Sequence, residues 1–142
     1  MIEKANIVAK PIMISDECYD TMVHSGKGTR SEATDLANAI SDGVDCVLLG
    51  EACTEGAYPL ETVAAVSRIA CEAELNVDHK RLFTEMVTLS ANPASTAEAV
   101  AASAVSAVNE LSVALIIVLT DSGKLAKLIA KYKPSVPIMV CS

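Results

Sequence analysis

The sequence predicts an α/β fold in which parallel strands alternate with helices. Short apolar runs occur at residues 11–15, 46–49, 114–119 and 137–141, and the second shows no alternation, as expected for a strand buried on both faces. Helix-start signals, two capping boxes and one proline, stand between these runs. The order strand, helix, strand, helix implies parallel strands joined by right-handed crossovers.

The first predicted unit begins with a strand over residues 11–15, which a proline introduces. A polar turn at residues 24–28 leads to a helix. Thr29 and Glu32 have capping-box spacing, so each side chain can satisfy a free amide at the helix start. The helix is predicted to end near Gly43.

The next elements are a strand over residues 46–49 and a helix opened by Pro59, where the missing amide of proline costs little. A short helix is predicted over residues 79–87. Ser95 and Glu98 then form a second capping-box pattern, which opens an alanine-rich helix to about Leu111.

The last predicted elements are a strand over residues 114–119, a turn over 120–123 and a helix over 124–133. Pro134 ends that helix, and residues 137–141 form the final strand.

Composition and charge divide the 142-residue chain into two parts. The 51% hydrophobic and 20% charged content excludes intrinsic disorder. Residues 1–75 carry 5 Lys/Arg and 13 Asp/Glu, a net charge of −8, whereas residues 76–142 carry 6 and 5, a net charge of +1. These values predict a domain boundary near residues 72–76, with domains over 1–75 and 76–142.

Several classes of function are excluded. Nucleic-acid binding is not expected, because neither part has a broad basic surface and the chain has no Trp and one Phe. No membrane association is expected, since the longest apolar run, at residues 113–119, is far shorter than the roughly 20 residues of a bilayer span. Five cysteines without a C-x-x-C pair predict no metal site and a cytoplasmic, reducing location.

Two loops are candidate phosphate sites. The run SGKGT at residues 25–29 resembles the end of a P-loop, but no glycine stands five residues before Gly26, so a surface turn is the stronger interpretation. The second candidate comprises Thr120, Ser122, Gly123 and Lys124, between a strand and a helix whose free amides point at the loop. Lys127 and Lys131 follow on the same helix face. The alternative is a capped turn with a solvated lysine face.

Other titratable residues give weaker signals. Asp16, Glu17 and Asp20 follow a strand, where catalytic groups of α/β folds often lie, although an acidic helix start gives the same pattern. His24 and His79 have no partner at ligand or triad spacing, so we expect exposed histidines without a catalytic role.

The run GTRSEATDLANAISDGVDCVLL at residues 28–49 resembles pyruvate kinase, whose sequences read PTRAExxDVANAxxDGxDCxML. The resemblance continues through Gly56 and the YPLE of residues 58–61, and it returns in ALIIVLTDSGK at residues 114–124. It covers essentially the whole chain.

The resemblance implies that residues 1–75 are the last two βα units of a TIM-type (β/α)8 barrel. Residues 76–142 would be part of a parallel α/β C-terminal domain. Family members are tetramers, so the expected partners are pyruvate kinase subunits in a homo- or hetero-oligomer, with Arg30 at a subunit interface. The loop from Thr120 to Lys124 would be part of a site for a sugar-phosphate effector, bound weakly here because Leu125 replaces a serine.

The departures from the family pattern concern catalysis. The family's strand end ATQ is Ser15, Asp16 and Glu17 here, and a carboxylate beside phosphoenolpyruvate would disfavour binding. In the family's SGETAKG, Gly50 replaces the serine and Glu55 the lysine.

The family uses Mg2+ and K+, but its catalytic lysine and metal-binding motif are not in this sequence. We therefore expect no cofactor in this chain alone and no phosphoryl transfer from phosphoenolpyruvate to ADP. The alternative is a non-catalytic protein that binds full-length pyruvate kinase subunits.

Overall fold

The computed structural model describes residues 1–15, 19–90 and 95–142. Their contacts divide the chain into two compact units. One comprises Pro11–Val77 and is called the acidic unit here. The other combines Glu3–Lys10 with Asp78–Ser142 and is called the terminal unit. The sequence predicted a single cut after residue 75, whereas the contacts place residues 3–10 with the second half of the chain.

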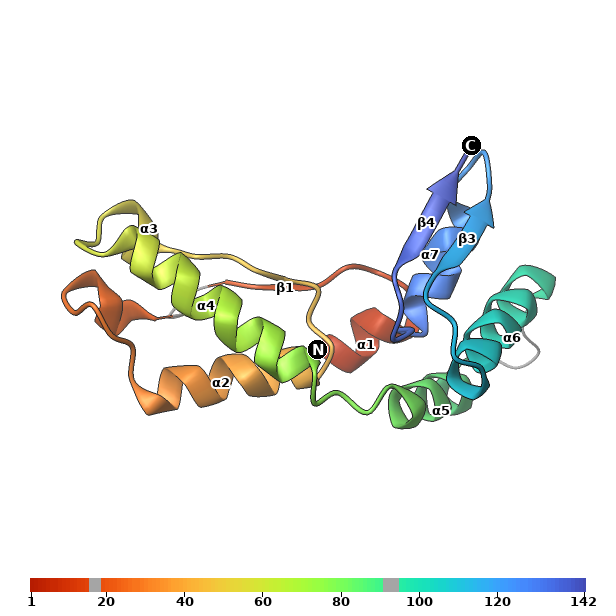
Figure 1. Cartoon of the computed structure of the whole chain (residues 1–142), viewed down its shortest axis with the longest axis horizontal. Helices are drawn as coiled ribbons and strands as arrows, with labels where there is room; N and C mark the ends of the chain where they lie inside the picture. The colour runs from red at the N-terminus through yellow and green to blue at the C-terminus, as the bar shows by residue number, and fades with distance from the viewer. Residues whose placement is uncertain (16–18, 91–94) are drawn as a thin grey trace. The chain divides into compact units, whose positions relative to one another are not determined.

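The acidic unit contains one short parallel sheet and two long helices. Strand β1 (Met13–Ile14) pairs in parallel with β2 (Cys46–Val47), and Met13 lies opposite Cys46. Helices α2 (Arg30–Ser41) and α4 (Pro59–Glu74) lie side by side (Figure 1). The strands are shorter than predicted. Two elements of this unit were not predicted from sequence, namely η1 (Asp20–Val23) and α3 (Glu51–Thr54).

The predicted helix starts of the acidic unit are confirmed. The hydroxyl of Thr29 accepts a hydrogen bond from the amide of Glu32 at 3.3 Å, and the Glu32 carboxylate accepts one from the Thr29 amide at 2.7 Å. Pro59 occupies the first turn of α4. A buried cluster of Tyr19, Met22, Leu36 and Val66 joins η1, α2 and α4.

The terminal unit contains the second parallel sheet and four helices among its described residues. Strand β3 (Ile116–Leu119) pairs with β4 (Ile138–Cys141). The helices are α1 (Ile2–Ile7), α5 (His79–Leu89), α6 (Thr96–Glu110) and α7 (Lys124–Lys131). The sequence did not predict α1, a six-residue helix without a side-chain cap. It is held by packing, since Ile7 contacts the core of this unit.

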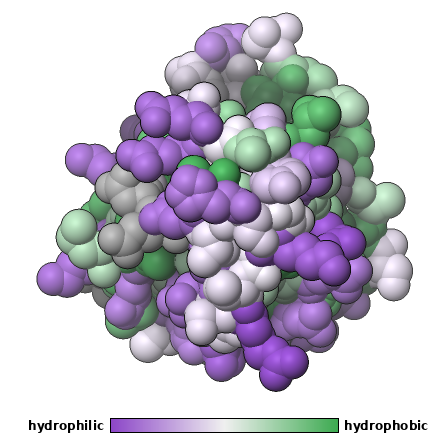
Figure 2. Space-filling model, turned by 90° about the vertical axis from the view of Figure 1, so that its left-hand side faces the viewer, coloured by the Kyte–Doolittle hydropathy of each residue, from purple (hydrophilic) through white to green (hydrophobic). Residues whose placement is uncertain are grey.

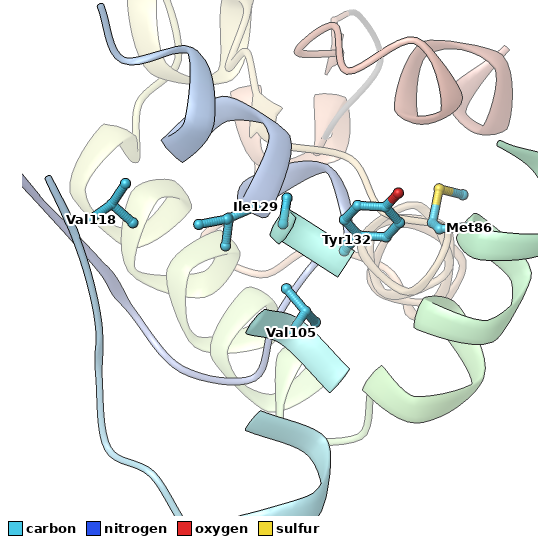
Figure 3. Close-up of a cluster of buried hydrophobic side chains, with 6 residues drawn as sticks. Met86, Val105, Val118, Ile129 and Tyr132 are labelled. Atoms are coloured by element: carbon cyan, nitrogen blue, oxygen red, sulfur yellow. The ribbon is translucent and has the colours of Figure 1, made fainter. Parts of the chain in front are cut away.

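That core consists of buried residues from α5, α6, β3 and α7, together with the residue after α7. Figure 3 shows Val105 and Ile129 between Val118 on one side and Tyr132 and Met86 on the other. Aliphatic and aromatic side chains both contribute to this core. The ring centres of Tyr132 and Phe83 lie 5.7 Å apart. The core fixes α7 against β3, and so determines where the loop between them lies.

The second predicted capping box forms only in part. The Ser95 hydroxyl accepts a hydrogen bond from the Glu98 amide at 3.2 Å. The Glu98 carboxylate, however, pairs with the ammonium group of Lys131 on α7 and does not return to the Ser95 amide. Within the described ranges, no helix is long and apolar enough to cross a membrane.

Candidate functional site

Three places in the structure correspond to the predicted site residues. The first is the end of β2, where the family resemblance suggested substrate contacts. Gly50 precedes α3, and its carbonyl accepts hydrogen bonds from the Cys53 amide at 3.1 Å and the Thr54 hydroxyl at 3.4 Å. A Cβ atom at Gly50 would meet nothing within 4 Å. Asp16 and Glu17 lie outside the described residues.

The second place is the loop between β3 and α7. Thr120 continues the strand pairing, because its amide donates to the Cys141 carbonyl at 3.0 Å. Gly123 has φ of 68°, a left-handed conformation that glycine adopts without strain. The Ser122 hydroxyl accepts a hydrogen bond from the Lys124 amide at 3.4 Å. The loop is therefore the strand-to-helix turn that the sequence predicted.

Lys131 is buried, which corrects the expectation that it shares one helix face with Lys124 and Lys127. Its side chain is 4% exposed, it pairs with Glu98, and its Nζ lies 5.4 Å from the centre of the Tyr132 ring. Burial of an ammonium group is tolerated because a carboxylate accompanies it. Lys124 and Lys127 remain exposed.

The third place is the start of α2, which contains Arg30. The side chain of Arg30 is exposed at the first position of the helix. It borders an open groove of about 600 Å³ between the turn at residues 26–29, α2 and α4. The P-loop-like run at residues 25–29 therefore lies at the edge of this groove. It leads into a helix as a P-loop does, but the element before it is η1 and not a strand.

Hydrogen bonds fix the turn before α2. The Glu32 carboxylate accepts from the amide and hydroxyl of Thr21 at 3.0 and 2.6 Å, and from the amide and hydroxyl of Thr29 at 2.7 Å each. Partial burial raises the pKa of Glu32, but these hydrogen bonds outweigh it and lower the pKa to about 2. The part played by Thr21 was not evident from the sequence, where only the Thr29–Glu32 spacing is a recognised signal.

The remaining candidates, His79, His24 and Asp20, lie outside these three places. His79 is half-buried, with its Nδ1 atom 2.9 Å from the Lys133 carbonyl oxygen, so the expectation of an exposed His79 was wrong. His24 is exposed, as expected, and Asp20 is the exposed first residue of η1.

In the described part of the chain, no group of three or more His, Cys, Asp or Glu side chains could hold a metal ion.

Two family models match the sequence. The first, for the pyruvate kinase barrel domain, matches residues 1–63, and the second, for the pyruvate kinase alpha/beta domain, matches residues 98–142. Together they match more than half of the chain. The chain belongs to the pyruvate kinase family.

Individual pyruvate kinases agree with this assignment. The chain is 45% identical over 139 residues to a cytosolic isozyme of pyruvate kinase from Glycine max, and 44% identical to one from Solanum tuberosum. Each match covers 98% of this chain and 27% of the relative. The chain therefore spans about a quarter of the length of the curated relatives it matches.

Solved pyruvate kinases share the fold. A crystal structure of a pyruvate kinase from Cryptosporidium parvum matches with a TM-score of 0.94 and 37% identity, over 99% of this chain and 29% of that one. A second structure, of Cryptosporidium parvum pyruvate kinase in complex with ADP, matches with a TM-score of 0.87. The mixed α/β architecture expected from sequence is thus that of pyruvate kinase.

Proposed function

We propose that this chain carries part of the machinery of the pyruvate kinase reaction, the transfer of a phosphoryl group from phosphoenolpyruvate to ADP. The observation that supports this most strongly is the fold match at a TM-score of 0.94, over nearly the whole chain, to a pyruvate kinase. In this proposal residues 1–75 are the last two βα units of a (β/α)8 barrel, and residues 76–142 are part of the C-terminal domain.

The 142 residues alone are proposed not to turn over substrate. Phosphoryl transfer depends on positioned metal ions and cations, and the described residues contain no cluster of three or more His, Cys, Asp or Glu side chains that could hold a metal ion. Gly50 offers no hydroxyl at the end of β2, and Glu55 carries a negative charge where the family has lysine. A carboxylate near a trianionic substrate repels it.

A coupled assay tests this directly. The purified chain is mixed with Mg2+, K+, ADP and phosphoenolpyruvate, and pyruvate formation is followed, with a full-length pyruvate kinase as positive control. We expect no turnover above background. Turnover comparable to the control would overturn the proposal that this chain is inactive alone.

A second function, binding to full-length pyruvate kinase subunits without catalysis, is supported by a different observation. The β3–β4 sheet leaves large apolar side chains exposed, with Ile117 at 62%, Leu119 at 79% and Met139 at 50%. Arg30 is also exposed, at the place where the family resemblance puts a subunit contact. Co-purification of the tagged chain with an intact pyruvate kinase would support this function. Absence of association at micromolar concentrations of both proteins would exclude it.

The loop at residues 120–124 is proposed to bind a sugar phosphate weakly. Its support is the strand-to-helix geometry with exposed Ser122 and Lys124. Because the curated relatives from Glycine max and Solanum tuberosum are named cytosolic isozymes, we also propose a cytoplasmic location for this chain. Fractionation of the tagged chain tests the location.

A further inference from the structure

We infer that His79 is a conformational latch, which holds the turn between α7 and β4 through a hydrogen bond from its Nδ1–H group to the carbonyl oxygen of Lys133. The Nδ1 atom lies 2.9 Å from that oxygen, and the two residues are 54 positions apart in the sequence. His79 is half-buried at the first position of α5. The bond therefore joins the start of one helix to the end of another.

The acceptor fixes the position of the ring proton. A neutral imidazole can carry its proton on either nitrogen, and the hydrogen bond made by one nitrogen decides which of them is protonated. A carbonyl oxygen only accepts hydrogen bonds, so Nδ1 of His79 is the donor and Nε2 carries the lone pair of the neutral ring. The fold therefore selects one tautomer, which can be measured on the native chain without any substitution.

The turn that His79 holds is one that a lysine does not adopt readily. Lys133 has φ of 47°, in the left-handed region, where the Cβ atom of an L-residue comes too close to the backbone. Its amide donates to the Ala130 carbonyl at 3.0 Å, and Pro134 then prevents a further helical turn. Such a backbone conformation persists where the surrounding structure stabilises it, and His79 supplies a stabilising contact from outside the turn.

A second contact from α5 reaches the neighbouring residue. Phe83 lies four residues after His79 and so on the same face of α5. Its ring centre is 5.7 Å from that of Tyr132, which is buried in the core of the terminal unit. Two successive residues at the end of α7 are thus held by one helix, Tyr132 through packing and Lys133 through a hydrogen bond.

The turn matters because it lies within the parallel unit β3–α7–β4. Strand β4 pairs with β3 from Ile116 and Ile138 to Leu119 and Cys141. The direction in which the chain leaves α7 determines where β4 begins. His79 lies outside this unit in the sequence, so α5 controls the path of the chain into β4. All of these contacts lie inside the terminal unit, and the latch is independent of the proposed catalytic, partner-binding and phosphate-binding functions.

The chain contains one other histidine, His24, which serves as a matched control. It is exposed and directly follows η1 in the acidic unit. Figure 2 views the end of the chain that contains η1, and hydrophilic residues (purple) are prominent on that surface. A ring that water solvates exchanges between both tautomers, so His24 shows what an unlatched histidine of this chain looks like.

The first experiment measures the imidazole nitrogen resonances of the full chain, labelled with 15N, at a pH above which neither ring changes further. We expect His79 to show a protonated Nδ1 and an unprotonated Nε2. His24 should show the averaged shifts of two exchanging tautomers. A His79 ring that is protonated at Nε2, or averaged in the same way as that of His24, would overturn the inference.

Substitutions then show whether the bond holds the turn. In His79→Ala, hydrogen exchange of the Tyr132 and Lys133 amides should accelerate about fivefold, the value of one neutral hydrogen bond. Exchange of the α6 amides should stay unchanged. His79→Asn keeps an N–H donor near the position of Nδ1 and should restore most of the protection. Adding Lys133→Gly to His79→Ala should also restore it, because glycine adopts positive φ without strain. Unchanged exchange in His79→Ala, or equal acceleration throughout α6, would overturn the inference.

Discussion

The Glu32 carboxylate joins η1 to α2 through Thr21, accepting hydrogen bonds from the amide and the hydroxyl of that residue at 3.0 and 2.6 Å. The same carboxylate completes the capping box with Thr29. One side chain therefore fixes both the start of a helix and the segment that precedes it. The groove edge at residues 26–29 depends on this arrangement.

Replacement of this carboxylate should destabilise the acidic unit. In Glu32→Gln, one carboxylate oxygen becomes an NH2 group, which cannot accept a hydrogen bond from the backbone amide of Thr21 or Thr29 that it faces, and the negative charge is lost. The pKa falls from 4.5 to about 2 on folding, which corresponds to about 3 kcal/mol before solvent screening. Because Glu32 is only partly buried, we expect a loss of about 1–2 kcal/mol at pH 7. Urea unfolding followed by the amide resonances of α2 measures it.

The effect should depend on pH in a defined direction. A lowered folded-state pKa stabilises the chain above the unfolded pKa of 4.5, and this stabilisation is lost as the pH falls towards 2. The native chain and Glu32→Gln should therefore converge in stability between pH 5 and about pH 2. Asp35→Asn, an exposed change on the same helix, should show neither effect. A constant difference across this pH range would contradict the assignment.

Gly28 should not tolerate a side chain, whereas Gly50 should. A Cβ atom at Gly28 would overlap the ring of Tyr19, which is 2% exposed and cannot move aside freely. Overpacking of this kind costs about 1–3 kcal/mol, so Gly28→Ala should lower the urea midpoint of the acidic unit. Gly50→Ala meets open space and should change it little. Similar losses for both variants would mean that the Tyr19 ring does not limit this position.

The helices with local start signals were predictable from sequence. The Thr29–Glu32 spacing and the proline at position 59 identify α2 and α4 because the signals depend on residues within one turn. The helix α1 carries no such signal and depends on contacts of Ile7 with residues far along the chain. Tyr19 has φ of 68°, a left-handed conformation that is uncommon for residues other than glycine. A tyrosine at this position therefore gives no sign of it in the sequence.

Parts of the candidate sites were not predictable for a related reason. Lys131 was expected on the same helix face as Lys124 because their spacing is helical, but it is buried beside Glu98, which lies 33 residues away in the sequence. The groove combines Lys27 and Arg30 with Arg68, which no sequence spacing connects. The loop at residues 120–124 was predictable, since a strand, a glycine and a helix follow one another directly. Long-range pairing is what the sequence does not reveal.

Removal of Glu98 should destabilise the terminal unit more than removal of an exposed charge. Glu98→Ala would leave the ammonium group of Lys131 buried without its carboxylate, and breaking a buried pair typically costs about 3–5 kcal/mol. The double variant Glu98→Ala with Lys131→Met should recover part of this loss, because no buried charge remains. Lys127→Met, on the exposed face of α7, is the control. Urea unfolding followed by the amide resonances of α6 and α7 gives the comparison. A double variant no more stable than Glu98→Ala would contradict this account.

The loop between β3 and α7 should bind phosphate with about millimolar affinity, through Lys124 and the amides at the start of the helix. Each exposed charge or dipole contact contributes only about 0.3–1 kcal/mol, and one amide of the loop is already engaged by the Ser122 hydroxyl. Lys124→Gln should therefore weaken binding several-fold, about as much as the loss of one such contact predicts. Lys127→Gln, one turn further along α7, should have a smaller effect because the dipole field falls off within the first turn. Phosphate titration followed at the amide resonances of residues 120–125 measures both. Equal effects of the two variants, or shifts only at residues 26–33, would show that this loop is a capped turn without a ligand.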